Sequence, residues 1–143
     1  MELTPQQHQF LEGTHGAAMI TVGGDGFSKA ARVGVALVDG KLQSSARSGA
    51  VRTARLRRDP RCTLFVFDSR FSYLTLETTV TIVGQPESVD ASVTLFRAMQ
   101  GRPEGPLAWF GRELEEDEFR RQMVDEDRIV FEFEVSRAYG LVT

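Results

Sequence analysis

The stretch that decides the fold is KAARVGVALVDGKLQSS, residues 29–45. Its first part alternates between apolar residues and smaller or charged ones, which is the two-residue period of a half-buried β-strand. The apolar residues of one face are Val33, Val35 and Leu37. Asp39-Gly40 then supplies a dipeptide that favours a two-residue hairpin turn. We therefore expect a strand over residues 29–38, paired with a second strand over residues 41–45.

Further strand signals lie on both sides of this hairpin. They cover residues 17–22, 61–67, 73–83 and 129–135. Residues 61–67 are apolar at nearly every position, so we expect this strand to be buried on both sides. Residues 73–83 alternate between apolar residues and Thr or Glu, which is typical of a strand with one side facing solvent. With the hairpin, the chain has about six expected strands, which favours a small antiparallel barrel.

Four stretches are predicted to be helices, over residues 4–13, 48–58, 89–100 and from 113 to at least 121. Thr4 is a suitable N-cap for the first helix, and Pro5 suits its first turn. Ser48 is a plausible N-cap for the second helix, which Asp59-Pro60 ends. Residues 101–106, rich in Gly and Pro, are expected to form a loop.

Composition places the chain among single-domain globular proteins, with one domain over residues 1–143. Apolar residues make up 41% and charged residues 26%, which excludes a disordered chain. The formal net charge of −3 argues against a general nucleic-acid binder. The N-terminus lacks the apolar core of a signal peptide, and no apolar run approaches the ~20 residues of a membrane span. We expect a soluble, cytoplasmic protein that binds neither nucleic acid nor membranes.

Positive charge is concentrated in residues 47–61, which contain one acid, Asp59, and six arginines. The arginines are Arg47, Arg52, Arg55, Arg57, Arg58 and Arg61. One interpretation is a solvated helix face. The other is an anion site, because a helix N-terminus offers unpaired N–H groups and Arg52, one turn in, can bind a phosphate with two hydrogen bonds. Ser44, Ser45 and Ser48 lie just before this helix or at its start.

The remaining polar residues give no sign of independent catalytic chemistry. His8 and His15 lie together near the N-terminus, and the single cysteine, Cys62, excludes an intramolecular disulfide. We predict no metal site and no hydrolase triad, and we expect Cys62 to be a packed core thiol. An enzyme with this profile would take its chemistry from a cofactor.

Two other segments are open to interpretation. The acidic block at residues 113–127 is expected to be a solvent-facing helix. Trp109 and Phe110 form either a plug in the core or a lid over a pocket.

Four pieces of sequence, in this order and spacing, carry a resemblance. They are RVGV (32–35), LQSSAR (42–47), VRTARLRRDPR (51–61) and YGL (139–141). Over residues 10–141 the chain resembles the pyridoxamine 5′-phosphate oxidase-like superfamily, and its ending resembles the short bacterial members that use the deazaflavin coenzyme F-420. LRRDPR, residues 56–61, is the most specific piece.

The resemblance implies a split β-barrel that forms a homodimer with two cofactor sites at the interface. It implies that Arg32 lines the flavin ring, that the end of the next strand meets the cofactor, and that Arg52, usually a lysine in the family, binds its phosphate. Where the family often has a second basic residue, this chain has Ala50, so Arg47 or Arg55 is expected to compensate. The cofactor-binding residues predicted in this way are Arg32, Ser44, Ser45, Ala46, Arg47, Arg52, Thr53, Arg55 and, from the partner subunit, Tyr73.

The activity implied by the resemblance is an F-420-dependent oxidoreductase. It would transfer a hydride from the reduced cofactor to a conjugated acceptor such as an enone, a quinone or a tetrapyrrole. One alternative is an oxidoreductase of the same fold that uses FMN, and another is a non-catalytic flavin- or heme-binding protein. The tryptophan and arginine motif that vitamin-B6 oxidases carry at their C-terminus is missing from the end of this chain. We therefore do not predict vitamin-B6 oxidation, and we assign no catalytic side chain.

Overall fold

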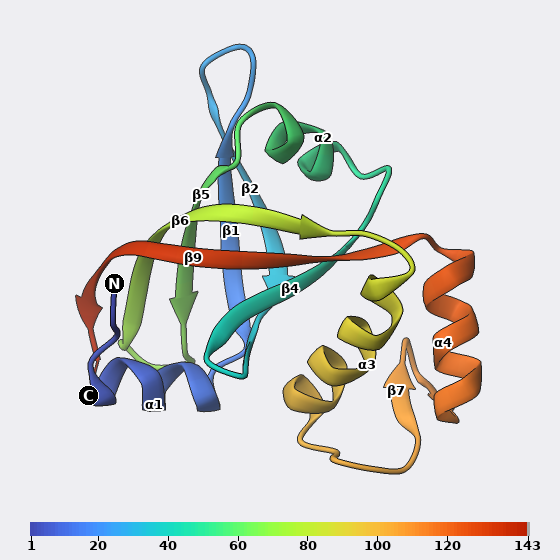
Figure 1. Cartoon of the computed structure of the whole chain (residues 1–143). Coiled ribbons are helices and arrows are strands. Elements are labelled where there is room, and N and C mark those ends of the chain that lie inside the picture. Colours follow the sequence, from blue (N-terminus) through green and yellow to red (C-terminus); the bar gives the residue numbers. More distant parts are fainter. Residues whose placement is uncertain (143) are drawn as a thin grey trace.

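A seven-stranded antiparallel sheet curls into a barrel with helices around it (Figure 1). The computed structural model describes residues 1–142 of the protein. Its elements are α1 (Pro5–Gly13), β1 (Gly16–Val22), β2 (Ser28–Gly34), β3 (Ala36–Val38), β4 (Lys41–Arg47), α2 (Val51–Arg58), β5 (Arg61–Phe67), β6 (Tyr73–Val83), α3 (Glu87–Gln100), β7 (Leu107–Trp109), β8 (Arg112–Leu114), α4 (Glu116–Asp125) and β9 (Arg128–Leu141). The expected mainly β, antiparallel architecture is confirmed.

The sheet has the strand order β2-β1-β5-β6-β9-β4-β3, so β2 and β3 lie at its two edges. One residue, Val35, separates these strands in the chain, and the two edges must therefore meet. The Val35 N–H donates to the His15 carbonyl (2.8 Å), and His15 Nδ1 donates to the Val35 carbonyl (2.9 Å). Ser44 Oγ donates to the Gly34 carbonyl (2.7 Å) across the same seam.

The prediction of one continuous strand over residues 29–38 is therefore wrong. The chain turns at Val35 and changes its partner from β1 to β4. Val33 and Val35 are both buried, so the alternation of buried and exposed residues continues through the corner. The sequence pattern therefore gives no sign of the corner. The predicted hairpin at Asp39-Gly40 is confirmed, because β3 and β4 pair with Val38 opposite Lys41.

Helices α1 and α2 lie at opposite ends of the barrel (Figure 1). In α1, Thr4 Oγ1 accepts from the Gln7 N–H (3.1 Å) and Gln7 Oε1 accepts from the Thr4 N–H (3.0 Å), which confirms the predicted N-cap. Leu11 of α1 is fully buried against the barrel core. Helix α1 therefore covers apolar side chains that would otherwise face water.

Strands β5 and β6 have the predicted bounds, but β5 is buried on one side only. Cys62, Leu64 and Val66 point into the core, whereas Phe67 is 47% exposed. The expectation of burial on both sides is wrong for β5, because its outer face carries no helix. The apolar sequence therefore leaves an aromatic surface on the outside of the barrel.

Helix α3 covers the other outer face, over β9, β4 and β3. Ser88 Oγ donates to the Arg128 carbonyl (2.9 Å), and Leu95 packs on Val130. The structure corrects the predicted helix start at residue 113. Residues 107–114 form the β7–β8 hairpin, which sequence reasoning missed, and α4 begins only at Glu116.

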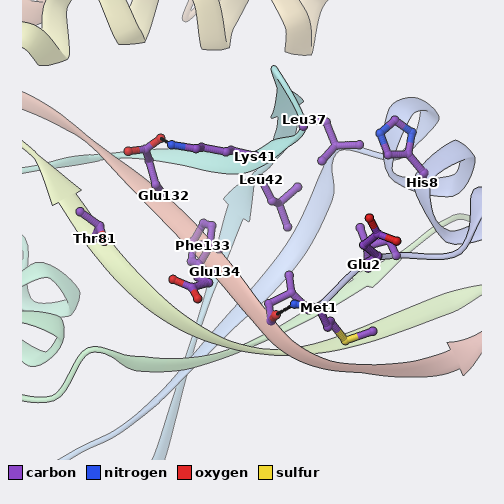
Figure 2. A pocket seen from close by; sticks show the side chains of 13 residues that line it. Met1, Glu2, His8, Leu37, Lys41, Leu42, Thr81, Glu132, Phe133 and Glu134 are labelled. Carbon is purple, nitrogen blue, oxygen red and sulfur yellow. Dashed lines mark hydrogen bonds and ion pairs between the residues drawn. The ribbon is translucent and has the colours of Figure 1, made fainter.

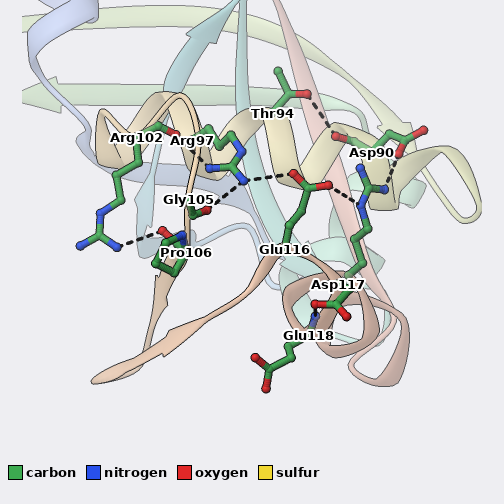
Figure 3. A network of polar contacts seen from close by, with 10 residues as sticks. Asp90, Thr94, Arg97, Arg102, Gly105, Pro106, Glu116, Asp117 and Glu118 are labelled. Carbon is green, nitrogen blue, oxygen red and sulfur yellow. Dashed lines mark hydrogen bonds and ion pairs between the residues drawn. The ribbon is translucent and has the colours of Figure 1, made fainter.

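Figure 3 shows how arginine side chains connect α3 to the segment that follows it. Arg97 donates to the carbonyls of Arg102 (3.1 Å) and Gly105 (3.0 Å) and to Glu116 (3.0 Å). Hydrogen bonds from Arg97 and from Arg120 lower the pKa of Glu116. The acidic block is therefore partly engaged in ion pairs within this unit.

The pairing of β9 with β6 places Gly140 opposite Leu74, at a φ of 152°. A Cβ at Gly140 would collide with the Tyr73 carbonyl oxygen. We expect Gly140→Ala to lower the free energy of unfolding by about 2 kcal/mol in urea denaturation, because the strands must separate locally. Gly13→Ala is the control, since a Cβ there meets nothing within 4 Å. Equal stability of the two variants would contradict the close approach.

Candidate functional site

Helix α2 carries most of the clustered arginines, and its first turn is fixed against the ends of β4 and β9. Thr53 Oγ1 donates to the Arg47 carbonyl (2.8 Å), and the Ser48 N–H donates to the Asp127 carbonyl (2.9 Å). The predicted start of this helix at Ser48 is wrong. Its N-cap is Ala50, without a side-chain bond, because Ser48 is still held in the β4–β9 pairing region.

Arg52 is the one member of this first turn with an unsatisfied charge. Its side chain is half-buried, its Nε is buried without a hydrogen-bond acceptor, and none of the carboxylates in residues 1–142 forms an ion pair with it. Burial, and then the positive charge of Arg128, lower the pKa of Arg52. A desolvated cation without a partner is costly for the folded state, and an anionic ligand would relieve that cost.

The neighbouring carboxylate, Glu126, is already shared by two other arginines. Arg47 Nη2 lies 3.2 Å and Arg128 Nε 3.1 Å from Glu126 Oε1. Burial raises the pKa of Glu126, but hydrogen bonds from Gln122 and Arg128 and the two positive charges outweigh it, so the pKa is lowered. Glu126 therefore stays ionised between Arg47 and Arg128, and Arg52 is left for an external anion.

Four of the predicted cofactor-binding side chains do not face solvent. Ser44 and Ala46 point into the barrel, and Thr53 lies on the buried side of α2. Ser45 stands opposite Val130, on the face that α3 covers, and its Oγ is buried without a partner. These residues can offer a ligand only backbone groups in this conformation.

Arg32 lines a hollow of about 500 Å³ on the outer face of the barrel. Its neighbours there are small or aromatic: Gly16, Ala17, Ala18, Ala30, Ala31 and Phe67, with Asp68 and Ser69. Arg32 stands opposite Ala18, and Ala18 stands opposite Phe65, so these residues share one row of the sheet. The small alanine side chains leave room for a flat ring system to lie on the sheet, and Phe67 can pack against its edge.

Tyr73 lies far from Arg52 within one chain. Its ring is 5.4 Å from that of Phe65, and it stands opposite Phe67 at the end of β5. Helix α2 leads into the other end of β5, about 20 Å away at the usual rise of a strand. The structure therefore brings Arg47 and Arg52 together but not Tyr73.

Arg55 turns to a different hollow, of about 680 Å³, at the end of the barrel that α2 covers. A further hollow, of about 700 Å³, lies at the opposite end, between α1 and the β3–β4 hairpin (Figure 2). Leu37, Leu42 and Phe133 line its apolar part, and Lys41 lies 3.8 Å from Glu132 at its rim. None of the predicted cofactor-binding residues lines this 700 Å³ hollow.

The remaining candidate groups have structural partners. His8 pairs with Glu12 (2.7 Å), and His15 binds Val35 as described above. Cys62 is 4% exposed, and burial raises the pKa of its thiol to about 12, which confirms a packed core thiol. Within residues 1–142 the structure holds no group of three or more His, Cys, Asp or Glu side chains arranged for a metal ion. No helix in that range is long and apolar enough to cross a membrane.

The β7–β8 hairpin resolves the two interpretations of the aromatic pair. Trp109 is buried and packs edge-on against Phe96 and Phe119, so it is a core plug. Arg128 lies over its ring, 5.1 Å from the centroid. Phe110 is 82% exposed at the turn. Sequence reasoning missed Arg128, because only the β4–β9 pairing brings it beside Arg47.

A sequence model of the pyridoxamine 5′-phosphate oxidase family matches residues 3–141. The chain belongs to this family. No curated protein sequence matches it. The match covers almost the whole chain, so the family assignment applies to the entire barrel and not to a fragment of it.

Solved structures of the same fold differ widely in sequence from this family member. A conserved hypothetical protein from Mycobacterium tuberculosis has a TM-score of 0.76 at 18% identity, covering 99% of this chain and 86% of the other. An F-420 reductase has a TM-score of 0.66 at 18% identity, covering 92% and 94%. A heme-binding protein from Mycobacterium smegmatis has a TM-score of 0.62 at 14% identity, covering 99% and 59%. At these identities the likeness shows the split-barrel fold alone.

The unpaired charge of Arg52 makes a stability prediction. We expect Arg52→Met to raise the free energy of unfolding by about 1 kcal/mol in a buffer without phosphate, because a desolvated cation is replaced by an apolar chain of similar length. Arg57→Met is the matched control, since Arg57 is exposed and donates to Ser48 Oγ (3.1 Å). Inorganic phosphate should reduce the difference in free energy of unfolding between Arg52→Met and the wild type, because it should stabilise the wild type alone. A clear loss of stability in Arg52→Met would show that Arg52 is a structural residue.

Proposed function

We propose that the protein is an oxidoreductase that uses the deazaflavin coenzyme F-420 to reduce a conjugated acceptor. The observation that carries this proposal is Arg52, half-buried, unpaired and beside Arg128. The family includes oxidoreductases, and its members and structural neighbours bind flavins, deazaflavin or heme. One neighbour of the same fold is an F-420 reductase.

The residues present fit the anionic part of such a cofactor. Arg52 has a buried Nε without an acceptor, and Arg47 adds a second, exposed guanidinium at the same corner. A phosphate bound there would accept charge-assisted hydrogen bonds, which are roughly twice as strong as neutral ones. The deazaflavin tail carries a phosphate and several glutamates, so an arginine-rich helix suits it better than it suits FMN.

The flat ring of the cofactor is assigned to the hollow beside Arg32. The bound cofactor supplies a hydride at its ring, and the chain supplies the orientation. Ala18 and Ala30 leave room for a ring to lie flat, and Phe67 limits its sideways movement. Holding the acceptor against that ring accounts for most of the rate in such a reaction. A backbone N–H, a hydroxyl or water then protonates the product.

The proposed site is completed by a second copy of the chain. The outer barrel face around Tyr73 carries several exposed apolar side chains. Its exposed members are Phe67, Phe71, Tyr139 and Leu141. An exposed patch of this kind marks an interaction surface, and a homodimer would bring Tyr73 of one subunit towards the cofactor bound by the other.

Titration of the purified protein with F-420 and with FMN, followed by fluorescence quenching, tests the cofactor. We expect micromolar or tighter binding of F-420, weaker binding of FMN, and a roughly 30-fold loss of F-420 affinity in Arg52→Met. Arg57→Met should bind as the wild type does. Oxidation of reduced F-420 by enone, quinone or tetrapyrrole acceptors then tests turnover.

Other outcomes of the titration identify the alternatives. A preference for FMN would identify the FMN-dependent oxidoreductase. A Soret band on adding heme, with no flavin binding, would identify the heme-binding protein. Binding of neither flavin would show that the arginines of α2 form a solvated face.

Mixing two variants that each bind F-420 weakly tests whether both subunits contribute residues to one cofactor site. Arg52→Met and Tyr73→Ala should each bind F-420 weakly alone. Random exchange of subunits should restore about a quarter of all sites, because one site of each mixed dimer is intact. The two variants kept unmixed at the same total concentration are the control. No recovery after exchange, in a mixture proven to contain mixed dimers, would show that Tyr73 does not act on the partner's site.

A further inference from the structure

The hollow of about 700 Å³ between α1 and the β3–β4 hairpin has no part in the proposed function (Figure 2). The pairing of β4 with β9 ends with Leu42 opposite Phe133, whereas β9 continues to Leu141. The hollow lies at this point, because its lining includes residues 40–42 of the hairpin and residues 132–135 of β9. A ligand there can reach residues of both faces of the barrel wall.

The inner-face residues of the hollow are apolar. Leu37, Leu42 and Phe133 stand in one row across β3, β4 and β9, since Leu42 is opposite both of the others. Leu42 and Phe133 are buried, and Leu37 is half-buried and packs against the barrel core. A hydrocarbon chain laid along this row would gain about 25 cal/mol for each Å² of apolar surface that it removes from water.

The outer-face residues of the hollow carry negative charge. Glu132 and Glu134 alternate with Phe133 along β9, so they lie on the other side of the sheet. Lys41 Nζ is 3.8 Å from Glu132 Oε2, which is too long for a hydrogen bond. In the part of the chain that the structure describes, no hydrogen bond or ion pair engages the carboxylate of Glu134. The two carboxylates are therefore poorly compensated.

Gln43 adds an unsatisfied acceptor beside Glu132, which it faces in the β4–β9 pairing. Its Nε2 donates to Glu132 Oε2 (3.2 Å), whereas its Oε1 is buried without a donor. The residue is 7% exposed, and an acceptor left unpaired at that depth costs stability. An ammonium group has three N–H donors, which are enough for Glu132 and Gln43 together.

The other positive groups that line the hollow have acceptors of their own. The amino group of Met1 donates to the Val135 carbonyl (3.2 Å), and His8 pairs with Glu12 (2.7 Å). The hollow therefore offers unpaired acceptors and carboxylates next to a row of apolar side chains. This combination is complementary to a molecule with a cationic head that donates hydrogen bonds and an apolar body.

We propose that this hollow binds a primary alkylamine in its ammonium form. The ammonium group lies between Glu132 and Glu134, and the alkyl chain follows the row of Leu37, Leu42 and Phe133. The loose contact of Lys41 with Glu132 is the same pairing of an alkylammonium with a carboxylate, made by the chain itself. The inference goes beyond the proposed function and does not depend on it, because no predicted cofactor-binding residue lines the hollow.

Calorimetric titration of the purified protein at pH 7 with three probes separates the cationic head from the alkyl chain. n-Hexylamine should bind at least roughly tenfold more tightly than methylamine, because methylamine leaves the apolar row uncovered. It should also bind at least roughly tenfold more tightly than hexanoate, whose carboxylate would meet Glu132 and Glu134. Equal affinity for n-hexylamine and hexanoate, or no binding of n-hexylamine, would overturn the proposal.

Three variants locate the binding. Glu132→Gln and Glu134→Gln should each weaken the binding of n-hexylamine about fivefold, because each removes one carboxylate from the head. Glu104→Gln, the same change at an exposed loop residue, should bind as the wild type does. Glu134 is exposed, so its replacement should leave the midpoint of urea unfolding unchanged. Wild-type affinity in both of the first two variants would show that the amine binds elsewhere.

The titrations contain no F-420, so the two proposals fail separately. Absence of n-hexylamine binding leaves the cofactor site untouched, and absence of F-420 binding leaves the amine site untouched.

Discussion

The rest of the structure depends on the single-residue connection at Val35. Because β2 and β3 are the two edges of the sheet, this connection forces the sheet to curl until its edges meet. His15 holds Val35 through both its carbonyl and its ring, and Ser44 closes the seam beside it. Closure also removes two exposed sheet edges, which would otherwise pair with other chains.

Barrel closure decides where the arginines lie. Strand β4 pairs with β9 up to Arg47 opposite Arg128, and α2 begins four residues later, on a loop that Asp127 and Thr53 hold in place. Arg52 is thereby brought beside Arg128 at a depth where water solvates it only in part. Such an arrangement costs stability, and an anion bound beside Arg52 would relieve that cost.

The sequence predicted the parts of the molecule whose signals are local. The α1 cap at Thr4, the bounds of β5 and β6 and the Asp39-Gly40 hairpin follow from neighbouring residues, and the structure confirms them. The corner at Val35 was invisible, because alternation does not record which strand is the partner. The β7–β8 hairpin was missed because its strands have three residues each and its turn places Phe110, an unfavourable residue, at a positive φ of 46°.

Only those residues of the candidate site that are close together in the sequence could be predicted. Arg47 and Arg52 follow from the arginine run, but Arg128 and the shared Glu126 come from the far end of the chain. Arg57 has a hydrogen-bond partner, Ser48, whereas Arg55 and Arg58 face a hollow. Residue type cannot predict this difference, since all three are arginines. It arises because Ser48 stands on one side of α2 and a hollow on the other.

The fold leaves the identity of the ligand open, because an F-420 reductase and a heme-binding protein share it. Charge is the more selective property. The chain has a net charge of −3, yet α2 gathers unpaired guanidinium groups and the acids are concentrated beyond residue 113. An anionic ligand is repelled by the acidic side of the molecule and attracted to the arginines of α2, which favours one orientation of approach.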